Sequence, residues 1–379
     1  MKQKKRKTKL SIVINLALIL LCIASAVVLI IGYFASTTDP RENSWIPVVG
    51  LSLHILIFLN ILWLFFWILR RKVWLLIPLI ALLCGVGHFG DYYQIEMTKE
   101  YGSENRSKLD TITIATYNVA GFKHLLDTDR RAQAVDSIAA YFKAQKVDVI
   151  CMQEYLDNPK DSMTLYGDAF SQWPYVDFMK IVKEKKLHKG MMVMSRYPLR
   201  NMNYYKFKGA VNGFMSVDLL RAKADTITLF NCHMQSTEFN QTQPEGLTAL
   251  VEREDREEAM IKVNEKLNVN FGKRAQQVDS LRYVIDSLRG RVIVAGDFND
   301  TPNSWAVTTT RSDDLRDSFR EAGSGYGYSY RPMKKLFRID YVLYHQDYFE
   351  ALEYSSPELP WSDHNPVVVK LVVKDINQE

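Results

Sequence analysis

The sequence predicts an α+β protein with largely antiparallel or mixed sheets, preceded by three membrane-spanning helices. Three observations support this prediction. The first ninety residues hold three long apolar runs, the pattern changes at Thr111, and the strands and helices that follow mix without strict βαβ alternation. A doubly wound parallel sheet needs that alternation, so layered sheets of mixed direction are favoured. A chain of 379 residues has room for one large domain and an appendage.

The apolar runs lie at residues 10–34, 47–69 and 73–89, and residues 1–90 are expected to form a membrane anchor. Crossing a bilayer takes about 20 apolar helical residues, so each run is expected to span. Six Lys/Arg precede the first run, and three more, Arg70 to Lys72, join the second and third. Basic residues stay on the cytoplasmic side of a membrane. We therefore expect a multi-pass protein whose N-terminus is cytoplasmic and whose globular part is extracytoplasmic. A cleaved signal peptide over 10–34, or a third run that does not cross, are the alternatives.

Positive charge is concentrated at the membrane end. Residues 1–90 carry ten Lys/Arg and two Asp/Glu, whereas residues 91–379 carry 38 Lys/Arg and 41 Asp/Glu, a net charge of −3. A nucleic-acid-binding domain usually carries a basic surface. The globular part has no such excess, which weighs mildly against bulk DNA as a substrate.

A polar linker is expected over residues 91–110 and a globular domain over residues 111–375. Alternation of β-branched and apolar residues predicts strands, and Ala/Val/Ile at helical spacing predicts helices. The expected strands are Thr111–Asn118, Val147–Gln153, Met191–Ser195, Phe214–Leu220, Thr226–His233, Arg291–Ala295, Arg338–His345 and Val367–Val373. The expected helices are Asp129–Ala144 and much of Leu247–Leu288. The segment 240–290 is expected to be an outer helix with an extended loop; a substrate-covering or membrane-facing element is the alternative.

Polar side chains occur where several of these apolar strands begin or end. They are Asn118, Glu154, His233, Asp297, Asn299, Asp340, Asp363 and His364. Each alone has an ordinary structural interpretation, such as a turn residue or a core histidine. Rigid elements can bring such positions together at one site.

Taken together, these residues fit metal-assisted phosphoester hydrolysis. Glu154 with Asn and Asp oxygens suits a hard divalent ion such as Mg²⁺, with Mn²⁺ as the alternative, and no His/Cys cluster indicates zinc. Asp297 can accept a proton from an attacking water. His364, paired with an acid such as Asp340, can stabilise or protonate a phosphate oxygen.

Seven segments, in this order, resemble the endonuclease/exonuclease/phosphatase superfamily, also called DNase-I-like. They are Ala115–Val119, Val149–Glu154, Met192–Leu199, Phe230–His233, Ala295–Pro302, Arg338–Leu343 and Ser362–Pro366. The resemblance covers almost the whole globular part. It implies a four-layered sandwich of two packed sheets with helices outside, and Mg²⁺-dependent cleavage of a phosphoester.

The resemblance also implies metal ligands. Glu154 matches the principal ligand, and Asn118 lies beside it as a ligand or a phosphate contact. Asp363 matches a metal ligand or a carboxylate that supports the ligands. Some branches carry an acid two residues after the strand-end Asn, where this chain has Ala120. One metal ion is therefore easier to support than two.

The same resemblance implies catalytic roles. Asp297, held by Asn299, matches the residue that orients or deprotonates the water. His364 matches the catalytic histidine, paired with Asp340. His233 matches a second histidine that contacts the phosphate or acts as general acid.

These expectations lead to a membrane-anchored, metal-dependent phosphoester hydrolase. Its expected partners are the lipid bilayer, through the N-terminal spans, and a phosphoester substrate, either a lipid head group or a nucleic acid. No feature of the sequence indicates an obligate protein partner. A cell-surface or periplasmic nuclease is the first alternative, and a catalytically inactive binding module is the second.

Overall fold

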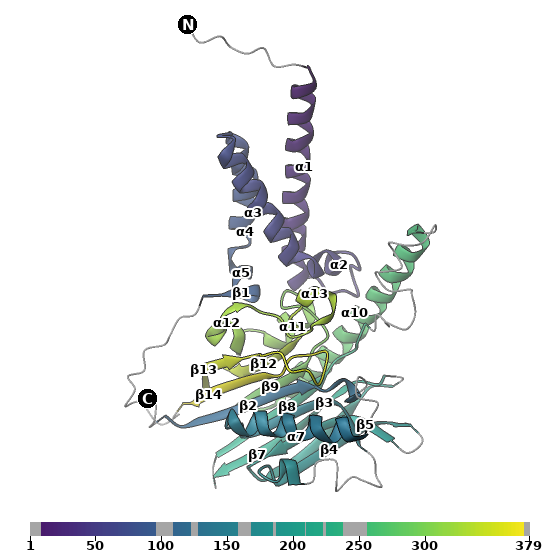
Figure 1. Cartoon of the computed structure of the whole chain (residues 1–379), viewed down its shortest axis with the longest axis vertical. Coiled ribbons are helices and arrows are strands. Elements are labelled where there is room, and N and C mark those ends of the chain that lie inside the picture. Colours follow the sequence, from purple (N-terminus) through teal and green to yellow (C-terminus); the bar gives the residue numbers. More distant parts are fainter. Residues whose placement is uncertain are drawn as a thin grey trace. The chain divides into compact units, whose positions relative to one another are not determined.

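The computed structural model describes residues 9–95, 109–122, 128–157, 168–184, 187–208, 210–222, 225–237 and 256–374. The chain forms two compact units (Figure 1). One comprises residues 1–89 with Asn303–Trp305, and the other comprises residues 90–302 and 306–379. Residues 91–95 of the expected linker are described and belong to the second unit, whereas 96–108 lie outside the described residues.

The first unit is helical. Its elements are α1 (Lys9–Tyr33), η1 (Phe34–Ser36), α2 (Ile46–Leu51), α3 (Leu53–Leu69), η2 (Val73–Leu75), α4 (Leu76–Cys84) and η3 (Val86–His88), and α5 (Phe89–Tyr92) continues from it into the second unit. Helices α1, α3 and α4 pack against one another. A polar contact joins two of them, because buried Asn60 donates to the Ser25 hydroxyl over 3.0 Å. Much of the apolar surface of α1 and α3 stays exposed, including Leu16, Leu20 and Phe58.

The three spans expected from the sequence are not what the described residues form. One helix, Ser11–Ser36, is long and apolar enough to cross a bilayer with 26 residues. The expected span 47–69 is interrupted at Ser52, which leaves α3 with 17 residues. The expected span 73–89 is bent by 60° between Val73–Cys84 and Val86–Tyr92, where Gly85 breaks the helix. The described part of the chain therefore has one candidate spanning helix, or two if the bent pair counts as one.

The second unit contains two six-stranded mixed sheets, as predicted. The first has the order β13-β14-β2-β3-β5-β4, and the second has the order β10-β12-β9-β8-β7-β6. The pairs β2–β3 and β8–β9 are parallel, and the other neighbours are antiparallel. The first sheet comprises β2 (Thr111–Asn118), β3 (Val149–Asp157), β4 (Tyr175–Glu184), β5 (Leu187–Ser195), β13 (Phe349–Ser355) and β14 (Val367–Val373). The second comprises β6 (Leu199–Lys206), β7 (Gly213–Ala222), β8 (Asp225–His233), β9 (Arg291–Asp297), β10 (Leu315–Asp317) and β12 (Asp340–His345).

Helices flank the sheets (Figure 1). They are η4 (Ala120–Phe122), α7 (Thr128–Ala144), η5 (Asp168–Phe170), α10 (Arg256–Ser287), α11 (Trp305–Arg311), α12 (Ser318–Ala322) and α13 (Pro332–Lys335). A short pair, β1 (Tyr93–Gln94) and β11 (Gly325–Tyr326), completes the described elements. Of the expected helical segment, α10 is described, and residues 247–255 are outside the described residues.

Apolar side chains fill the space between the two sheets. Alternate residues of each sheet, such as Ile114 and Val193 from one and Val217 and Leu229 from the other, are fully buried in one cluster. On the outer face of the first sheet, α7 contributes a second cluster. Burial of alternate residues on each strand follows from the period of two. The two packed sheets hold the strand ends rigidly, which is what a catalytic site requires.

Candidate active site

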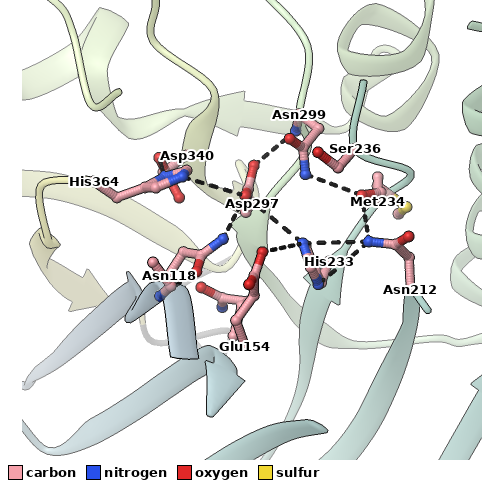
Figure 2. A network of polar contacts seen from close by, with 12 residues as sticks. Asn118, Glu154, Asn212, His233, Met234, Ser236, Asp297, Asn299, Asp340 and His364 are labelled. Atoms are coloured by element: carbon pink, nitrogen blue, oxygen red, sulfur yellow. Dashed lines mark hydrogen bonds and ion pairs between the residues drawn. The ribbon is translucent and has the colours of Figure 1, made fainter. Parts of the chain in front are cut away.

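Strand register brings the predicted polar residues to one edge of the two sheets. His233 pairs with Asp297 across β8 and β9, and Asp340 pairs with the same Asp297 across β12 and β9. In the other sheet, Asn118 pairs with the residue before Glu154 across β2 and β3. The C-terminal ends of the parallel strands β2 and β3 therefore lie beside those of the parallel strands β8 and β9. Figure 2 shows the side chains at these ends pointing toward one another.

Glu154 sits in a β-bulge. It has φ of 53°, and the register between β3 and β5 shifts between Met152 and Tyr155. A bulge re-aims the side chain it carries, and a left-handed non-glycine residue is a strained feature often found at functional sites. The carboxylate lies 3.6 Å from His233 Nε2 and 2.6 Å from Lys189 Nζ. It keeps partial exposure of 17%, so solvent or a ligand can reach it.

Asp297 occupies the centre of the network. Its Oδ2 accepts from Asn118 Nδ2 and its Oδ1 accepts from the Asn299 backbone N–H, each over 2.8 Å. Burial, with repulsion from Asp340, raises the pKa of Asp297 to about 7. A carboxyl that titrates near neutral pH is suited to proton transfer. Asn299 contacts Asp297 only through the backbone N–H described above, and its side chain instead donates to the Met234 carbonyl over 3.0 Å.

His364 is held by a buried acid. Its Nδ1 donates to Asp340 Oδ2 over 2.9 Å, and both side chains are almost completely buried. Burial alone lowers the pKa of His364, but attraction to Asp340 and Asp297 outweighs it and raises the pKa to about 10. The other ring nitrogen, Nε2, lies 3.9 Å from Asp297 Oδ2. The imidazole is thus oriented with one nitrogen on its acid and the other facing the central carboxylate.

His233 has a different environment. Its Nε2 lies 3.9 Å from Asp297 Oδ2, and buried Asn212 contacts both of its ring nitrogens within 3.4 Å. Burial lowers the pKa of His233 to about 4 despite the nearby Glu154. The two histidines therefore differ in charge, because His233 is neutral at pH 7 and His364 is protonated.

Asp363 is the predicted residue that the network does not include. It lies next to His364 and is partly exposed, and its side chain accepts a 3.4 Å hydrogen bond from Ser362. Its charge raises the pKa of His364. The other seven predicted residues, from Asn118 to His364, are joined through the contacts that Figure 2 draws.

Several residues that build the site were not predicted from the sequence. Lys189 reaches Glu154 from β5, and Asn212, the residue before β7, orients His233. The Ser329 hydroxyl accepts from the backbone N–H groups of Ile339 and Asp340 over 2.9 and 3.0 Å. Ser362 donates from its hydroxyl to the Asn118 carbonyl over 2.6 Å. Among these, only Ser362 had a sequence signal, because it begins the segment that carries His364.

The chemistry of the donor set fits a divalent cation. Glu154, Asp297 and Asp340 supply carboxylate oxygens, which Mg²⁺ and Mn²⁺ prefer, whereas Asn118 donates from Nδ2 to Asp297 and its Oδ1 accepts from the Ala120 N–H over 2.9 Å. Buried Asp340 Oδ1 has no hydrogen-bond partner among the described residues. Ligand atoms of Asp297, Asp340 and His364 lie within 4.8 Å of one another, so they form one candidate group. The sequence instead assigned the metal to Glu154, Asn118 and Asp363, and that assignment stays a prediction.

Comparison with known proteins gives the family. The model of the Endonuclease/Exonuclease/phosphatase family matches residues 115–364, which spans most of the second unit. The chain therefore belongs to the endonuclease/exonuclease/phosphatase family. Residues 12–92 match a separate family, described as a domain of unknown function (DUF8431). No curated protein matches the sequence.

Solved structures resemble the chain at low sequence identity. The human Nocturnin catalytic domain with bound sulfate has 15% identity and a TM-score of 0.50, covering 71% of this chain and 98% of that one. An endonuclease/exonuclease/phosphatase from Bacteroides vulgatus has 18% identity and a TM-score of 0.48, covering 70% and 100%. D. rerio TDP2 complexed with a single-strand DNA product has 15% identity and a TM-score of 0.48, covering 69% and 99%. The Nocturnin likeness shows a shared fold.

Proposed function

We propose that the chain is a membrane-attached, Mg²⁺-dependent phosphoester hydrolase whose active site is the network around Asp297. The observation that supports it most is the convergence of Glu154, Asp297 and the Asp340–His364 pair at one sheet edge. An ion-pair cluster that only stabilises the fold would not require the left-handed backbone of Glu154 or a histidine, His364, that is hydrogen-bonded to the buried carboxylate of Asp340. Membership of the family supports the same reaction class.

Each side chain has a role that its contacts allow. Asp297 is positioned by two hydrogen bonds and can take a proton from the attacking water. His364 is kept protonated by Asp340 and can neutralise charge on, or donate a proton to, a phosphoryl oxygen. His233 is neutral and can donate a hydrogen bond to the same group, with its ring fixed by Asn212.

Glu154 is the main residue we assign to the metal, and Asn118 would join it through the second lone pair of Oδ1, whose other lone pair accepts from the Ala120 N–H. A divalent ion there would polarise the phosphoryl oxygen as a Lewis acid. The alternative group of Asp297, Asp340 and His364 fits less well, because the raised pKa of His364, about 10, keeps its ring protonated, and a protonated imidazole has no free nitrogen lone pair for a metal ion. Glu154 Oε1, by contrast, faces the site with His233 at 3.6 Å. One ion is supported, since Ala120 replaces the acid that a second would use.

The N-terminal unit supports attachment to a bilayer. Most of helix α1 belongs to the 26-residue apolar segment Ser11–Ser36, and basic residues cluster ahead of this segment. With α1 as the crossing helix, the positive-inside rule places the N-terminus in the cytoplasm and the catalytic unit on the extracytoplasmic side. Attachment concentrates the enzyme at lipid substrates, so phospholipid head groups are the substrate class we favour.

A substrate panel tests this proposal. The full chain, purified in detergent or nanodiscs, is incubated with Mg²⁺ or with EDTA against sphingomyelin, phosphoinositides, plasmid DNA, single-stranded DNA and RNA. We expect EDTA-sensitive release of a head group or phosphate from one of the lipids. Plasmid nicking or RNA cleavage without lipid turnover would instead support a membrane-attached nuclease.

The inactive binding module is tested in the same experiment. It predicts no turnover of any substrate and no binding of Mg²⁺ or Mn²⁺ by the folded protein. That combined result would contradict the proposed function.

A further inference from the structure

The segment Gly90–Gln94 follows directly after the last apolar helix in sequence, yet it is built into the catalytic unit. Strand β1 within it pairs antiparallel with β11, placing Tyr93 opposite Tyr326 and Gln94 opposite Gly325. The Gly327 N–H also donates to the Tyr92 carbonyl over 2.9 Å. The segment therefore extends the backbone hydrogen bonding of the loop that begins at β11.

Asp91 fastens this segment from inside the domain. Its carboxylate is 2% exposed and lies 2.8 Å from Arg320 Nη1 and 3.5 Å from Arg311 Nη1. Its backbone carbonyl accepts from Arg338 Nη2 over 3.1 Å. A buried carboxylate is costly unless it is paired and hydrogen-bonded, so these arginines fix where the segment can sit.

The two parts of the chain that contact this segment, Arg338 and the loop after β11, are both connected to His364. Arg338 precedes Asp340 by two residues, and Asp340 accepts from His364 Nδ1. The loop after β11 reaches Tyr330, whose ring lies 5.0 Å from the His364 ring. These two connections are themselves joined, because the N–H groups of Ser329 and Tyr330 both donate to the Phe337 carbonyl.

We propose that Gly90–Gln94 is a positioning element of the active site and that Asp91 is its key residue. The segment contacts residues 325–340 at two points, strand β11 and Arg338. These contacts set the position of Asp340 and Tyr330 and thereby of His364. The catalytic consequence rests on the proposed function, whereas the effect on His364 does not. A catalytic fragment that begins after Gln94 lacks these contacts.

The test compares two full-length variants in detergent, Asp91→Asn and Asp225→Asn. Asp225 is a matched control because it also lies between two arginines, Arg221 and Arg291, at the opposite end of β8 from His233. At about 3.3 Å per residue it is some 25 Å from the site. In each variant the ¹⁵N-histidine NMR signal of His364, assigned with His364→Gln, is recorded. The kcat and KM for bis-p-nitrophenyl phosphate are measured on the same samples.

We expect Asp91→Asn to shift the His364 signal and to lower kcat by about 10²-fold with little change in KM, since small misplacements of a catalytic group cost that much. Asp225→Asn should leave both unchanged. An unshifted His364 signal with wild-type kcat in Asp91→Asn would overturn the proposal. Equal shifts and losses in both variants would also overturn it, because they would indicate general destabilisation.

A second variant covers a failure of the first to fold. If Asp91→Asn does not fold, Arg320→Gln is used, since Arg320 is one-third exposed and removing it breaks the shorter ion pair. If the wild-type chain hydrolyses no probe, the proposed function fails and the His364 signal alone decides the positioning role.

Discussion

At the scale of single residues, the site balances three carboxylates against two cations. Glu154, Asp297 and Asp340 bring negative charge into a largely buried network, and His364 and Lys189 compensate it. Lys189 lies against the residue that we assign to the metal, so its ammonium and a divalent ion compete for one carboxylate. Removing the charge of Glu154 or of Lys189 should therefore change metal affinity and turnover.

Replacing the assigned ligand should change the metal dependence. We expect Glu154→Gln to raise the Mg²⁺ concentration needed for half-maximal rate and to reduce turnover, because the amide carries no charge for the ion. Titration of rate against Mg²⁺ measures this. Glu265→Gln, an exposed position on α10, is the control. A wild-type titration curve for Glu154→Gln would remove Glu154 from the metal site.

Removing the competing ammonium of Lys189 should raise the affinity for the metal ion, whereas Glu154→Gln should lower it. We expect Lys189→Met to bind Mn²⁺ more tightly than the wild type, because Lys189 Nζ lies 2.6 Å from Glu154 Oε2. Electron paramagnetic resonance of free Mn²⁺ during titration gives the affinity. Lys206→Met changes an exposed lysine on β6 and should bind as the wild type does. Weaker binding by Lys189→Met would show that Lys189 does not compete for this carboxylate.

His364 should contribute to both rate and stability. We expect His364→Ala to unfold at a lower temperature, because buried Asp340 loses its partner, and to lose about 10²- to 10⁴-fold in kcat where it remains folded, the usual scale of acid–base contributions. Steady-state kinetics together with a melting curve separate the two effects. A near-wild-type kcat would place His364 outside the reaction.

At the scale of elements, strand ends and the connections after them carry the chemistry. Gly296 shows how tightly the end of β9 is packed: its φ is 149°, and a Cβ there would lie 2.0 Å from the Cys232 carbonyl oxygen. A side chain at this position would push β9 away from β8. Since Asp297 is the next residue, the glycine controls the spacing between His233 and Asp297.

Gly296→Ala should therefore destabilise the domain by about 2–4 kcal/mol through steric clash and strain. Gly290→Ala is the matched control, because Gly290 also has positive φ but a Cβ added there would have no described atom within 4 Å. Chemical denaturation gives both free energies of unfolding. Equal losses in the two variants would attribute the effect to backbone strain and not to close approach of the strands.

The central strands could be predicted from sequence, and the edge strands could not. β2, β3, β8, β9, β12 and β14 are buried on both faces, so they carry largely continuous apolar or β-branched runs that are visible in the sequence. β6 is exposed along almost its whole length, so packing imposes no pattern on it. Lys189 was missed for a related reason: its partner comes from the neighbouring strand, which no local pattern specifies. Hydropathy likewise does not register the breaks at Ser52 and Gly85.

At the scale of the whole molecule, an apolar helical unit precedes the second unit, and residues 91–379 carry a net charge of −3. The length of α1 and its basic flank support one membrane crossing, and the remaining described helices of that unit are shorter or bent. The number of crossings decides on which side the catalytic unit lies. An odd number places it opposite the N-terminus.

The side of the membrane is therefore a prediction with a direct test. A C-terminal fusion to alkaline phosphatase, which is active only after export, should be active when the chain is produced in a bacterial host. A fusion after Arg71 should be inactive if a second crossing returns the chain to the cytoplasm, and active if α1 alone crosses. Inactive alkaline phosphatase at the C-terminus would place the catalytic unit in the cytoplasm.

We propose above all that the Asp297 network hydrolyses phosphoesters with a divalent ion. The most direct measurement is release of p-nitrophenolate from bis-p-nitrophenyl phosphate by the full chain and by Asp297→Asn, with Mg²⁺ and with EDTA. We predict that EDTA abolishes release, that excess Mg²⁺ restores it, and that Asp297→Asn lowers it by about 10²- to 10⁴-fold. Release that EDTA leaves unchanged, or that is equal in Asp297→Asn, would contradict the account.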